Sequence, residues 1–278
     1  MKITALVENT SCKEGIKAEH GLSLFIEAKG KTILFDTGAS KMFSENAKKL
    51  NVDLTKVDLA VLSHGHYDHS GGIHTFLTLN SKAPMYMRKT AFGPYYSERD
   101  GGDEAFIGID ESLITNNRLI FTGKETPLAE GISLFSNVKG DRFLPTGNKS
   151  LLKKTETGYI QDDFAHEQNL VIEEDGISLL VSGCSHRGIV NIVDHFHSLF
   201  GYYPTHVIGG FHLYNHRTGK PESTETLRKI ADALLESGAT YYTCHCTGEE
   251  NYQILRTFMG DKVEYLSGGK TLDLEAVE

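Results

Sequence analysis

The segment Ser63-His64-Gly65-His66-Tyr67-Asp68-His69-Ser70-Gly71-Gly72 decides the fold and the chemistry of this chain. It follows an apolar run at residues 59–62 with the pattern of a buried strand, and it leads into a helix. Imidazole nitrogens and carboxylate oxygens are ligands that suit zinc, iron or manganese. We therefore predict a metal centre at the end of a strand, with one cation on the first pair of ligands and a second on the next pair: His64 and His66, then Asp68 and His69.

Short apolar runs separated by glycine-containing turns extend from this motif in both directions. Their spacing predicts strands at residues 2–7, 22–27, 32–35, 57–62, 85–87, 118–122, 132–137, 169–173, 177–181, 206–208 and 241–243. Apolar residues three and four positions apart predict helices over residues 41–50, 189–200 and 223–237, and a fourth that begins at Gly72. Strands precede helices in two rounds with no linker between them, so we expect one α/β domain over residues 1–278.

Residues 88–165 are less regular than the rest of the chain and carry few helix signals. A long irregular segment within a compact domain is usually functional, so we expect an insertion that serves as a lid or substrate loop. The segment also carries many basic and aromatic side chains in an otherwise acidic chain. This mixture suits a small anionic aromatic ligand, such as a phosphorylated pterin or a nucleotide, although a solvated charged surface has the same composition.

The composition excludes several classes of function. The chain has 28 Lys and Arg against 37 Asp and Glu, a formal net charge of −9, and no basic run that would bind nucleic-acid phosphates. No apolar run approaches the ~18 residues of a membrane span, and the N-terminal apolar stretch is too short for a signal peptide. The four cysteines do not form a disulfide framework, so we expect a cytoplasmic protein. Its expected partner is a small-molecule substrate, with no nucleic acid and no membrane, and a homodimer is the default assembly.

A second motif, Asp36-Thr37-Gly38, lies at the end of the predicted strand 32–35. Together with the pattern His-x-His-x-Asp-His after a strand, it resembles the metallo-β-lactamase superfamily. The order of predicted strands and helices is compatible with that resemblance over the whole chain. The resemblance implies an α/β (α+β) fold, a four-layer αββα sandwich built from two similar halves, with a metal site at one edge of the sheets.

Four further segments resemble one branch of this superfamily, which includes dihydropterin-methyl-ribofuranosylaminobenzene phosphate synthase-like proteins. The branch name is weak evidence for a reaction, because the resemblance concerns motifs and not a substrate. The segments are Glu19-His20-Gly21-Leu22-Ser23, Ser182-Gly183-Cys184-Ser185-His186-Arg187-Gly188-Ile189-Val190-Asn191, Gly209-Gly210-Phe211-His212-Leu213 and Cys244-His245-Cys246-Thr247-Gly248.

The resemblance also implies the remaining metal ligands. His186 follows a predicted strand and precedes a helix, as His64 does, and is the expected third ligand of the first metal. His166 is the rival, because it precedes Cys184 about where the superfamily's third histidine precedes its bridging aspartate. His245 resembles the superfamily's last histidine, a ligand of the second metal. Cys184 stands where the bridging aspartate would be, either as a thiolate ligand or as a small buried side chain.

Further polar residues are expected around the metals. A metal-bound imidazole usually needs an acceptor for its second N–H group, and Glu19, Asp36 or Glu167 would supply one. His212 and His20 are expected to contact the substrate or to support a ligand. The remaining histidines considered are expected to be structural or solvated: His195, His197, His206 and His216.

The expected cofactor is a pair of divalent metal ions, two zinc ions per chain in the first place, with manganese or iron as alternatives. Two such ions would hold a hydroxide at neutral pH and polarise a substrate oxygen, with Asp68 as the catalytic residue that orients the water or carries its proton. These features predict a metal-dependent hydrolase or transferase that acts on a small phosphate- or ester-bearing substrate. Two alternatives stay open. One is oxygen chemistry at a mononuclear iron, which the replacement of the bridging aspartate by Cys184 supports, and the other is a metal-binding sensor with little turnover.

Overall fold

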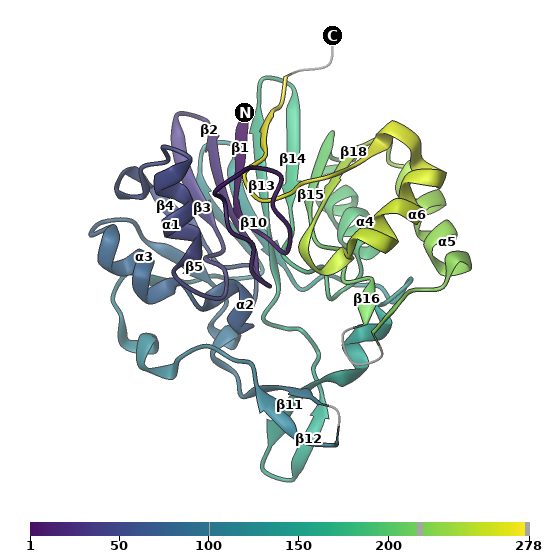
Figure 1. Ribbon diagram of the computed structural model, residues 1–278, viewed down its shortest axis with the longest axis horizontal. Coiled ribbons are helices and arrows are strands. Elements are labelled where there is room, and N and C mark those ends of the chain that lie inside the picture. The colour runs from purple at the N-terminus through teal and green to yellow at the C-terminus, as the bar shows by residue number, and fades with distance from the viewer. Residues whose placement is uncertain (100, 216–218, 276–278) are drawn as a thin grey trace.

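The computed structural model describes residues 1–99, 101–215 and 219–275. Within these ranges, two seven-stranded sheets stand face to face at the centre of the molecule (Figure 1). The first sheet has the order β20 (Thr271–Asp273), β1 (Lys2–Val7), β2 (Ser23–Ala28), β3 (Lys31–Phe35), β4 (Leu59–Val61), β5 (Met85–Met87) and β8 (Leu119–Phe121). The second has the order β19 (Val263–Tyr265), β18 (Thr240–Thr243), β15 (His206–Gly209), β14 (Ile177–Val181), β13 (Gln168–Glu174), β10 (Ile132–Ser136) and β9 (Glu125–Ala129).

Helices cover the outer face of each sheet and complete a four-layer αββα sandwich (Figure 1). α1 (Met42–Lys49) and α3 (Ile73–Leu79) lie against the first sheet, and α4 (Ile189–Phe200), α5 (Thr224–Leu235) and α6 (Glu249–Met259) lie against the second. Within the described ranges, no helix is both long enough and apolar enough to cross a membrane. The mixed α/β architecture confirms the fold that the sequence predicts.

Neighbouring residues of one strand belong to different layers of the core. In β3, Ile33 and Phe35 lie in the apolar cluster between the two sheets, whereas Leu34 lies in the cluster beneath the helices. The strand β14 alternates in the same way between the central cluster and the cluster under α4 and α5. Because both faces of each sheet are covered, these strands are continuous apolar runs in the sequence.

The strands that lead to the metal motif are parallel. In the first sheet β3, β4, β5 and β8 pair in parallel, and in the second β14, β15, β18 and β19 do so. Parallel strands end at the same edge of a sheet. The segments that follow β4, β14 and β18 therefore meet at one edge of the sandwich, where the short helix α2 (Tyr67–Ser70) lies (Figure 1).

The segment 88–165, expected to be one insertion, has two parts in the structure. Its strands β8, β9 and β10 belong to the two large sheets. Other strands form a separate four-stranded sheet in the order β12 (Gly158–Gln161), β11 (Leu151–Thr155), β6 (Tyr95–Glu98) and β7 (Glu104–Phe106), which lies at the bottom of Figure 1. A small pair, β16 (Tyr214–Asn215) and β17 (Lys220–Pro221), lies nearby. The single-turn 3-10 helices are η1 (Leu54–Lys56), η2 (Lys89–Phe92), η3 (Glu111–Thr115), η4 (Thr146–Ser150), η5 (His245–Thr247) and η6 (Gly260–Lys262).

Each of the predicted strands and helices has a counterpart in the structure, with ends that differ by at most a few residues. The helix α6 is missing from the prediction. It buries Asn251 beside Tyr252, Leu255 and Met259, so a polar residue interrupts the apolar face that would reveal it. The strands of the four-stranded sheet are also missing, since β12 is exposed along its whole length and shows no alternation.

Gln168, the first residue of β13, joins the two large sheets beside the metal motif. Its side-chain amide donates to the backbone oxygens of Leu62 and Tyr86, at 2.8 and 3.1 Å. Its carbonyl oxygen accepts from the hydroxyl of Thr122 at 2.6 Å, and its backbone N–H donates to Ser63 at 2.8 Å. The side chain is fully buried, so a lost partner would not be replaced by water.

Replacing Gln168 with Leu keeps the size of the side chain but removes three hydrogen bonds from the junction of the sheets. We expect the free energy of unfolding to fall by about 3 kcal/mol, because buried acceptors and a buried hydroxyl lose their partner. Chemical denaturation of both proteins measures the change. The matched control is Gln253→Leu on the exposed side of α6, where we expect a change below about 0.5 kcal/mol. Equal stability of the two variants would contradict the role of Gln168.

Candidate metal centre

The residues of the metal motif and the later histidines gather at the edge of the sandwich. His64, His66, Asp68 and His69 come from the segment after β4 and from α2, Cys184 and His186 from the segment after β14, and His245 from η5 after β18. All of these side chains are buried. Positions more than 100 residues apart in the chain are thus brought into contact: Nε2 of His69 lies 3.1 Å from Sγ of Cys184, and Nε2 of His64 lies 3.3 Å from Nε2 of His186.

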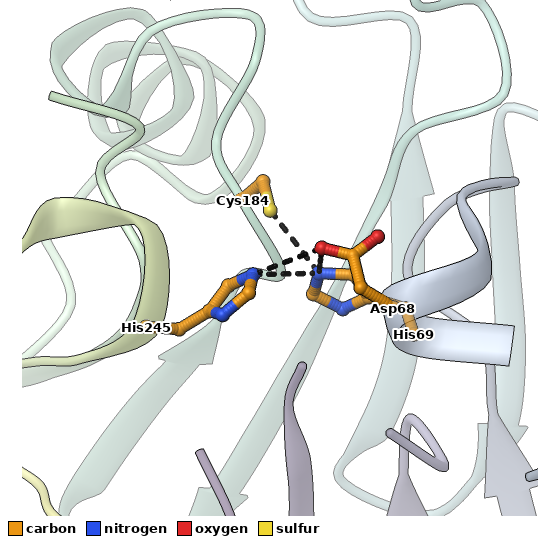
Figure 2. A group of neighbouring side chains, drawn as sticks. All are labelled: Asp68, His69, Cys184 and His245. Carbon is orange, nitrogen blue, oxygen red and sulfur yellow. Dashed lines mark hydrogen bonds and ion pairs between the residues drawn. The ribbon is translucent and has the colours of Figure 1, made fainter. Parts of the chain in front are cut away.

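One group of potential ligands consists of Asp68, His69, Cys184 and His245, which point toward one another in Figure 2. Their ligand atoms lie within 4.8 Å of one another. The Nε2 atom of His69 is 3.1 Å from Sγ of Cys184 and 3.2 Å from Nε2 of His245, and Oδ2 of Asp68 is 3.3 Å from Nε2 of His245. Two imidazoles, a carboxylate and a thiol form a donor set that suits zinc or iron.

A second group consists of His64, Cys184 and His186, again within 4.8 Å. The Nε2 atoms of its two histidines are 3.3 Å apart. Cys184 belongs to both groups, at the place where the resemblance expects a bridging ligand. Burial raises the pKa of its thiol well above the usual value, so a neighbouring cation is needed to stabilise the thiolate.

The histidines of both groups present Nε2 to the centre and are held through Nδ1. Each Nδ1 lies within hydrogen-bond distance of a side-chain oxygen of another residue, which fixes the orientation of the ring. The pairs are His64 with Ser63 at 2.9 Å, His69 with Asp36 at 2.6 Å, His186 with Asn148 at 3.0 Å and His245 with Asn9 at 2.7 Å.

The contact between His64 and His186 shows that the site fits a cation. Burial lowers the pKa of both imidazoles well below the usual value, so both are neutral. With the ring proton on Nδ1, donated to Ser63 and Asn148, each Nε2 carries only a lone pair. Two lone pairs at 3.3 Å cannot hydrogen-bond to each other, and a divalent cation between them would satisfy both.

The first group, that of Asp68, His69, Cys184 and His245, is electrostatically different. Burial opposes the protonation of His69, but the charges of Asp36 and Asp68 outweigh it and raise the pKa of this imidazole. Burial lowers the pKa of His245 to about 3. Burial alone would raise the pKa of Asp68, yet its histidine neighbours hold it well below the usual value. His69 is therefore the positively charged imidazole of this group and lies beside an ionised carboxylate, a place that a bound metal ion would take.

His166 and His186 have different surroundings. The Nδ1 atom of His166 accepts the backbone N–H of Gly65 at 2.9 Å, and its Nε2 is 3.0 Å from Oδ2 of Asp162. Both ring nitrogens therefore have protein partners, whereas Nε2 of His186 faces His64. The neutral ring of His166 donates from Nε2 to the carboxylate, so the geometry favours a supporting role for it.

His66 lies beside the same carboxylate. Its Nε2 is buried without a hydrogen bond and lies 3.8 Å from Oδ2 of Asp162. With His166, these side chains form a further buried group within 4.8 Å. Asp162 is absent from the sequence prediction, although its spacing of four residues from His166 is a weak signal for such a pair.

The carboxylates expected to accept from imidazoles divide into two kinds. Asp36 accepts from His69, as expected, and also from the hydroxyl of Ser63 at 2.7 Å. Glu19 instead accepts the backbone N–H groups that follow β3, at Ala39 and Ser40. Through these bonds it supports the loop that carries Asp36.

Glu167 likewise binds backbone and not an imidazole. It accepts the N–H groups of His186 and Arg187 at 2.6 and 3.1 Å. Burial raises the pKa of Glu167 to about 7. The residue therefore shapes the turn that presents His186.

A cavity of about 250 Å³ opens over the two groups. His20, His66, Asp68, Cys184 and His186 line its inner wall, with His212 and Cys246 beside them. His20 is 3.3 Å from the carboxylate of Asp68, and the His212 ring lies 4.3 Å from that of His186. Both histidines thus line the cavity, where a bound substrate would contact them.

Four residues that sequence reasoning did not single out also belong to the site. Asn9 and Asn148 hold ligand histidines, Asp162 lies behind His66, and Cys246 has its sulfur within 4.8 Å of Cys184 and His212. No local pattern marks the two asparagines. The position of Cys246 beside His245 is a signal for it, but its spacing from Cys244 does not match a zinc knuckle.

Several site residues have a backbone conformation that is unusual for side chains other than glycine. The angle φ is 59° at Asp36, 58° at Ser185, 50° at His212 and 51° at His245. Such conformations persist only where the surrounding structure enforces them, and they are concentrated at functional sites.

The remaining histidines lie elsewhere: His195 and His197 on α4 and His206 on β15, whereas His216 is outside the described residues.

Comparisons with known proteins agree with this geometry. The model of the metallo-beta-lactamase superfamily matches residues 16–241. A solved metal-dependent hydrolase of the beta-lactamase superfamily is 32% identical, covers 99% of both chains and has a TM-score of 0.82. The 7,8-dihydropterin-6-methyl-4-(beta-D-ribofuranosyl)-aminobenzene-5'-phosphate synthase of Methanocaldococcus jannaschii is 27% identical over 92% of this chain and 90% of its own length. An uncharacterized protein of the same organism is 28% identical over 88% of this chain and 90% of its own.

These matches confirm the resemblance that the motifs suggest, including that to the dihydropterin branch. The family model covers most of the chain, and the hydrolase shares its whole length with this fold. Because sequence and architecture agree over that extent, the chain belongs to the metallo-beta-lactamase superfamily and is an enzyme with the metallohydrolase fold.

Proposed function

We propose that this protein is a metal-dependent hydrolase or transferase that uses two divalent cations, zinc in the first place, on a small phosphate- or ester-bearing substrate. The observation that carries the proposal is the position of Cys184, whose sulfur is shared by two buried groups of ligands. A shared ligand between two sets of imidazoles is an arrangement that suits two adjacent ions. Bound there, the ions would supply a hydroxide at neutral pH and would polarise a substrate oxygen.

The residues of the chain have separate roles in this proposal. His64, His66 and His186 hold one cation, and Asp68, His69 and His245 hold the other, with Cys184 between them. The carboxylate of Asp68 also lines the cavity, where it accepts a proton from the attacking water and orients it. Asp36, Asn9 and Asn148 keep the imidazoles in the tautomer that leaves Nε2 available.

The cavity supports a small substrate. Its volume of about 250 Å³ is at the lower end of ligand sites. The synthase of M. jannaschii, whose name includes a pterin and a phosphate, is compatible with such a substrate for this chain. An acidic chain with net charge −9 favours a small molecule over nucleic acid as the partner.

Oxygen chemistry at one iron is the second candidate, since a thiol replaces the bridging carboxylate that the family resemblance leads us to expect. Two buried groups that each contain two or more imidazoles or carboxylates favour two ions over one.

The free thiols of Cys184, Cys244 and Cys246 favour a reducing compartment, and we propose the cytoplasm. The homodimer stays a prediction, and size-exclusion chromatography of the purified protein would measure the oligomeric state.

Metal analysis of the purified protein tests the ligand assignment. We expect about two zinc or manganese ions per chain, and about one after His186→Ala, because that change removes a ligand of one group only. His166→Ala is the matched variant and is expected to keep about two ions. Loss of an ion from His166→Ala but not from His186→Ala would exchange the two roles, and one iron per chain in the unmodified protein would favour oxygen chemistry.

Asp36→Asn tests the support of His69. The amide is a weaker acceptor for the Nδ1 proton, so we expect metal affinity to fall about 10- to 100-fold, as measured by competition with a coloured chelator. The control is Asp58→Asn. Asp58 accepts from Thr32 at the opposite ends of β3 and β4, and its loss should leave metal affinity unchanged. A similar fall in both variants would point to a general loss of stability.

Turnover is tested with panels of phosphodiesters, lactones and esters. We expect His69→Ala and His66→Ala each to lose one of the two ions and, with it, the activity, since each removes a ligand of one ion. The control His74→Ala changes an exposed histidine that pairs with Asp110 on the surface and should keep both. Activity that survives in the first two variants would refute the proposed hydrolase, and no turnover in the unmodified protein on any panel would favour a sensor.

A further inference from the structure

The cavity over the metal centre has an outer wall made by the four-stranded sheet. Ser97 and Glu98 of β6 line this wall together with Arg99, which follows the strand, and with Ile107 and Leu151. The inner wall carries the potential metal ligands. A molecule that occupies the cavity therefore lies between the metal ligands on one side and β6 on the other.

Arg99 is distinguished among the basic side chains of residues 88–165. Within the described part of that segment, no other Lys or Arg lines the cavity. Arg88 donates to the backbone oxygens of Thr122 and Gly123, and Arg142 forms an ion pair with Asp194 at 2.8 Å. Among the described basic side chains of the segment, Arg99 is therefore the one placed to meet a molecule in the cavity.

Two contacts hold Arg99 at the rim of the cavity. Its backbone N–H donates to Asp103 at 2.8 Å and its carbonyl oxygen accepts from Gly102 at 3.1 Å, which closes the turn after β6. Its side chain lines the same cavity as that of Tyr67, a residue of the metal motif. Burial raises the pKa of the Tyr67 phenol, and the nearby charge of Arg99 opposes that rise. The backbone N–H of Tyr67 donates in turn to Ile107 of the outer wall at 2.8 Å.

We propose that Arg99, with the hydroxyl of Tyr67, binds an anionic group of the substrate, a carboxylate or a phosphate, at the end remote from the reacting bond. This inference rests on the proposed function and narrows its substrate class to molecules with a second, non-reacting anion. A guanidinium offers two parallel N–H donors that match either oxyanion, and the phenol adds a third.

A chain-matched pair of substrates isolates this charge. Mono(4-nitrophenyl) succinate ends in a carboxylate, whereas 4-nitrophenyl butanoate has the same chain length and ends in a methyl group. We expect Arg99→Ala to raise KM for the succinate about tenfold with little change in kcat, the size of one solvent-accessible charge-assisted hydrogen bond. KM for the butanoate should not change, and Arg99→Lys should restore part of the loss.

Arg142→Ala is the matched control, because it removes a cation from the same segment that pairs with Asp194 away from the cavity. It should leave both KM values unchanged. The inference is overturned if Arg99→Ala leaves the ratio of the two KM values as in the unmodified protein, or if Arg142→Ala changes that ratio as much.

Binding measurements separate this inference from the proposed function. The two anilides that correspond to these esters, N-(4-nitrophenyl)succinamic acid and N-(4-nitrophenyl)butanamide, are titrated calorimetrically into the metal-loaded protein. Tighter binding of the acid that is lost in Arg99→Ala supports the inference even if neither ester is hydrolysed, a result that would count against esterase activity alone. The inference is overturned if the succinamic acid and the butanamide bind equally tightly to the unmodified protein. The phosphonate analogue of the acid distinguishes the two anions, since tighter binding than the carboxylate indicates a phosphate-bearing substrate.

Discussion

The structure depends on one contact, the approach of two neutral imidazoles whose Nε2 lone pairs face each other at 3.3 Å in the interior. Such a contact between His64 and His186 is unfavourable unless a cation lies between them. Neither ring can relieve it by taking up a proton or by turning over, because burial keeps both rings neutral and each Nδ1 already has an oxygen partner. The fold therefore holds the two rings in an arrangement that suits a bound metal ion.

The sandwich makes this contact possible by bringing two loops unusually close. Gly183 lies between the strand end and Cys184, and a Cβ atom there would overlap Oγ of Ser63. Any side chain at position 183 would push the loop of Cys184 and His186 away from the loop of His64. Since the two loops belong to different sheets, the same glycine sets the distance between the two halves at the site. Gln168 fixes that junction from behind through hydrogen bonds to Leu62 and Tyr86.

The four-stranded sheet adds a second wall to the cavity beside the candidate metal centre. The large sheets supply the ligands, and the segment after β6 supplies the outer wall with Arg99 at its rim. Tyr67 connects the two, because it belongs to the metal motif, donates its backbone N–H to Ile107 and lines the cavity together with Arg99. A change in this sheet would alter which molecules enter without altering the metal ligands, which is how function is modified on a common fold.

The sequence by itself determined the family, the four-layer sandwich, and the first cluster of candidate ligands. His64, His66, Asp68 and His69 lie within six residues of the chain, so their position at one edge of the sheets follows from the local sequence. Buried parallel strands are visible as apolar runs. The segment 88–165 stands out as irregular in the sequence, but its division between the large sheets and a separate sheet is not visible there, because β12 has no alternation.

Only the tertiary structure decided how the distant residues meet. Asn148 lies 38 positions from His186 and Asn9 lies 236 from His245, and no periodicity relates residues on separate loops. The preference for His186 over His166 as a candidate ligand also comes from the tertiary structure, because Gly65 and Asp162 are partners of both ring nitrogens of His166. A sequence pattern reports which side chains a short segment presents together, whereas the partners of a buried polar atom depend on how the two sheets pack.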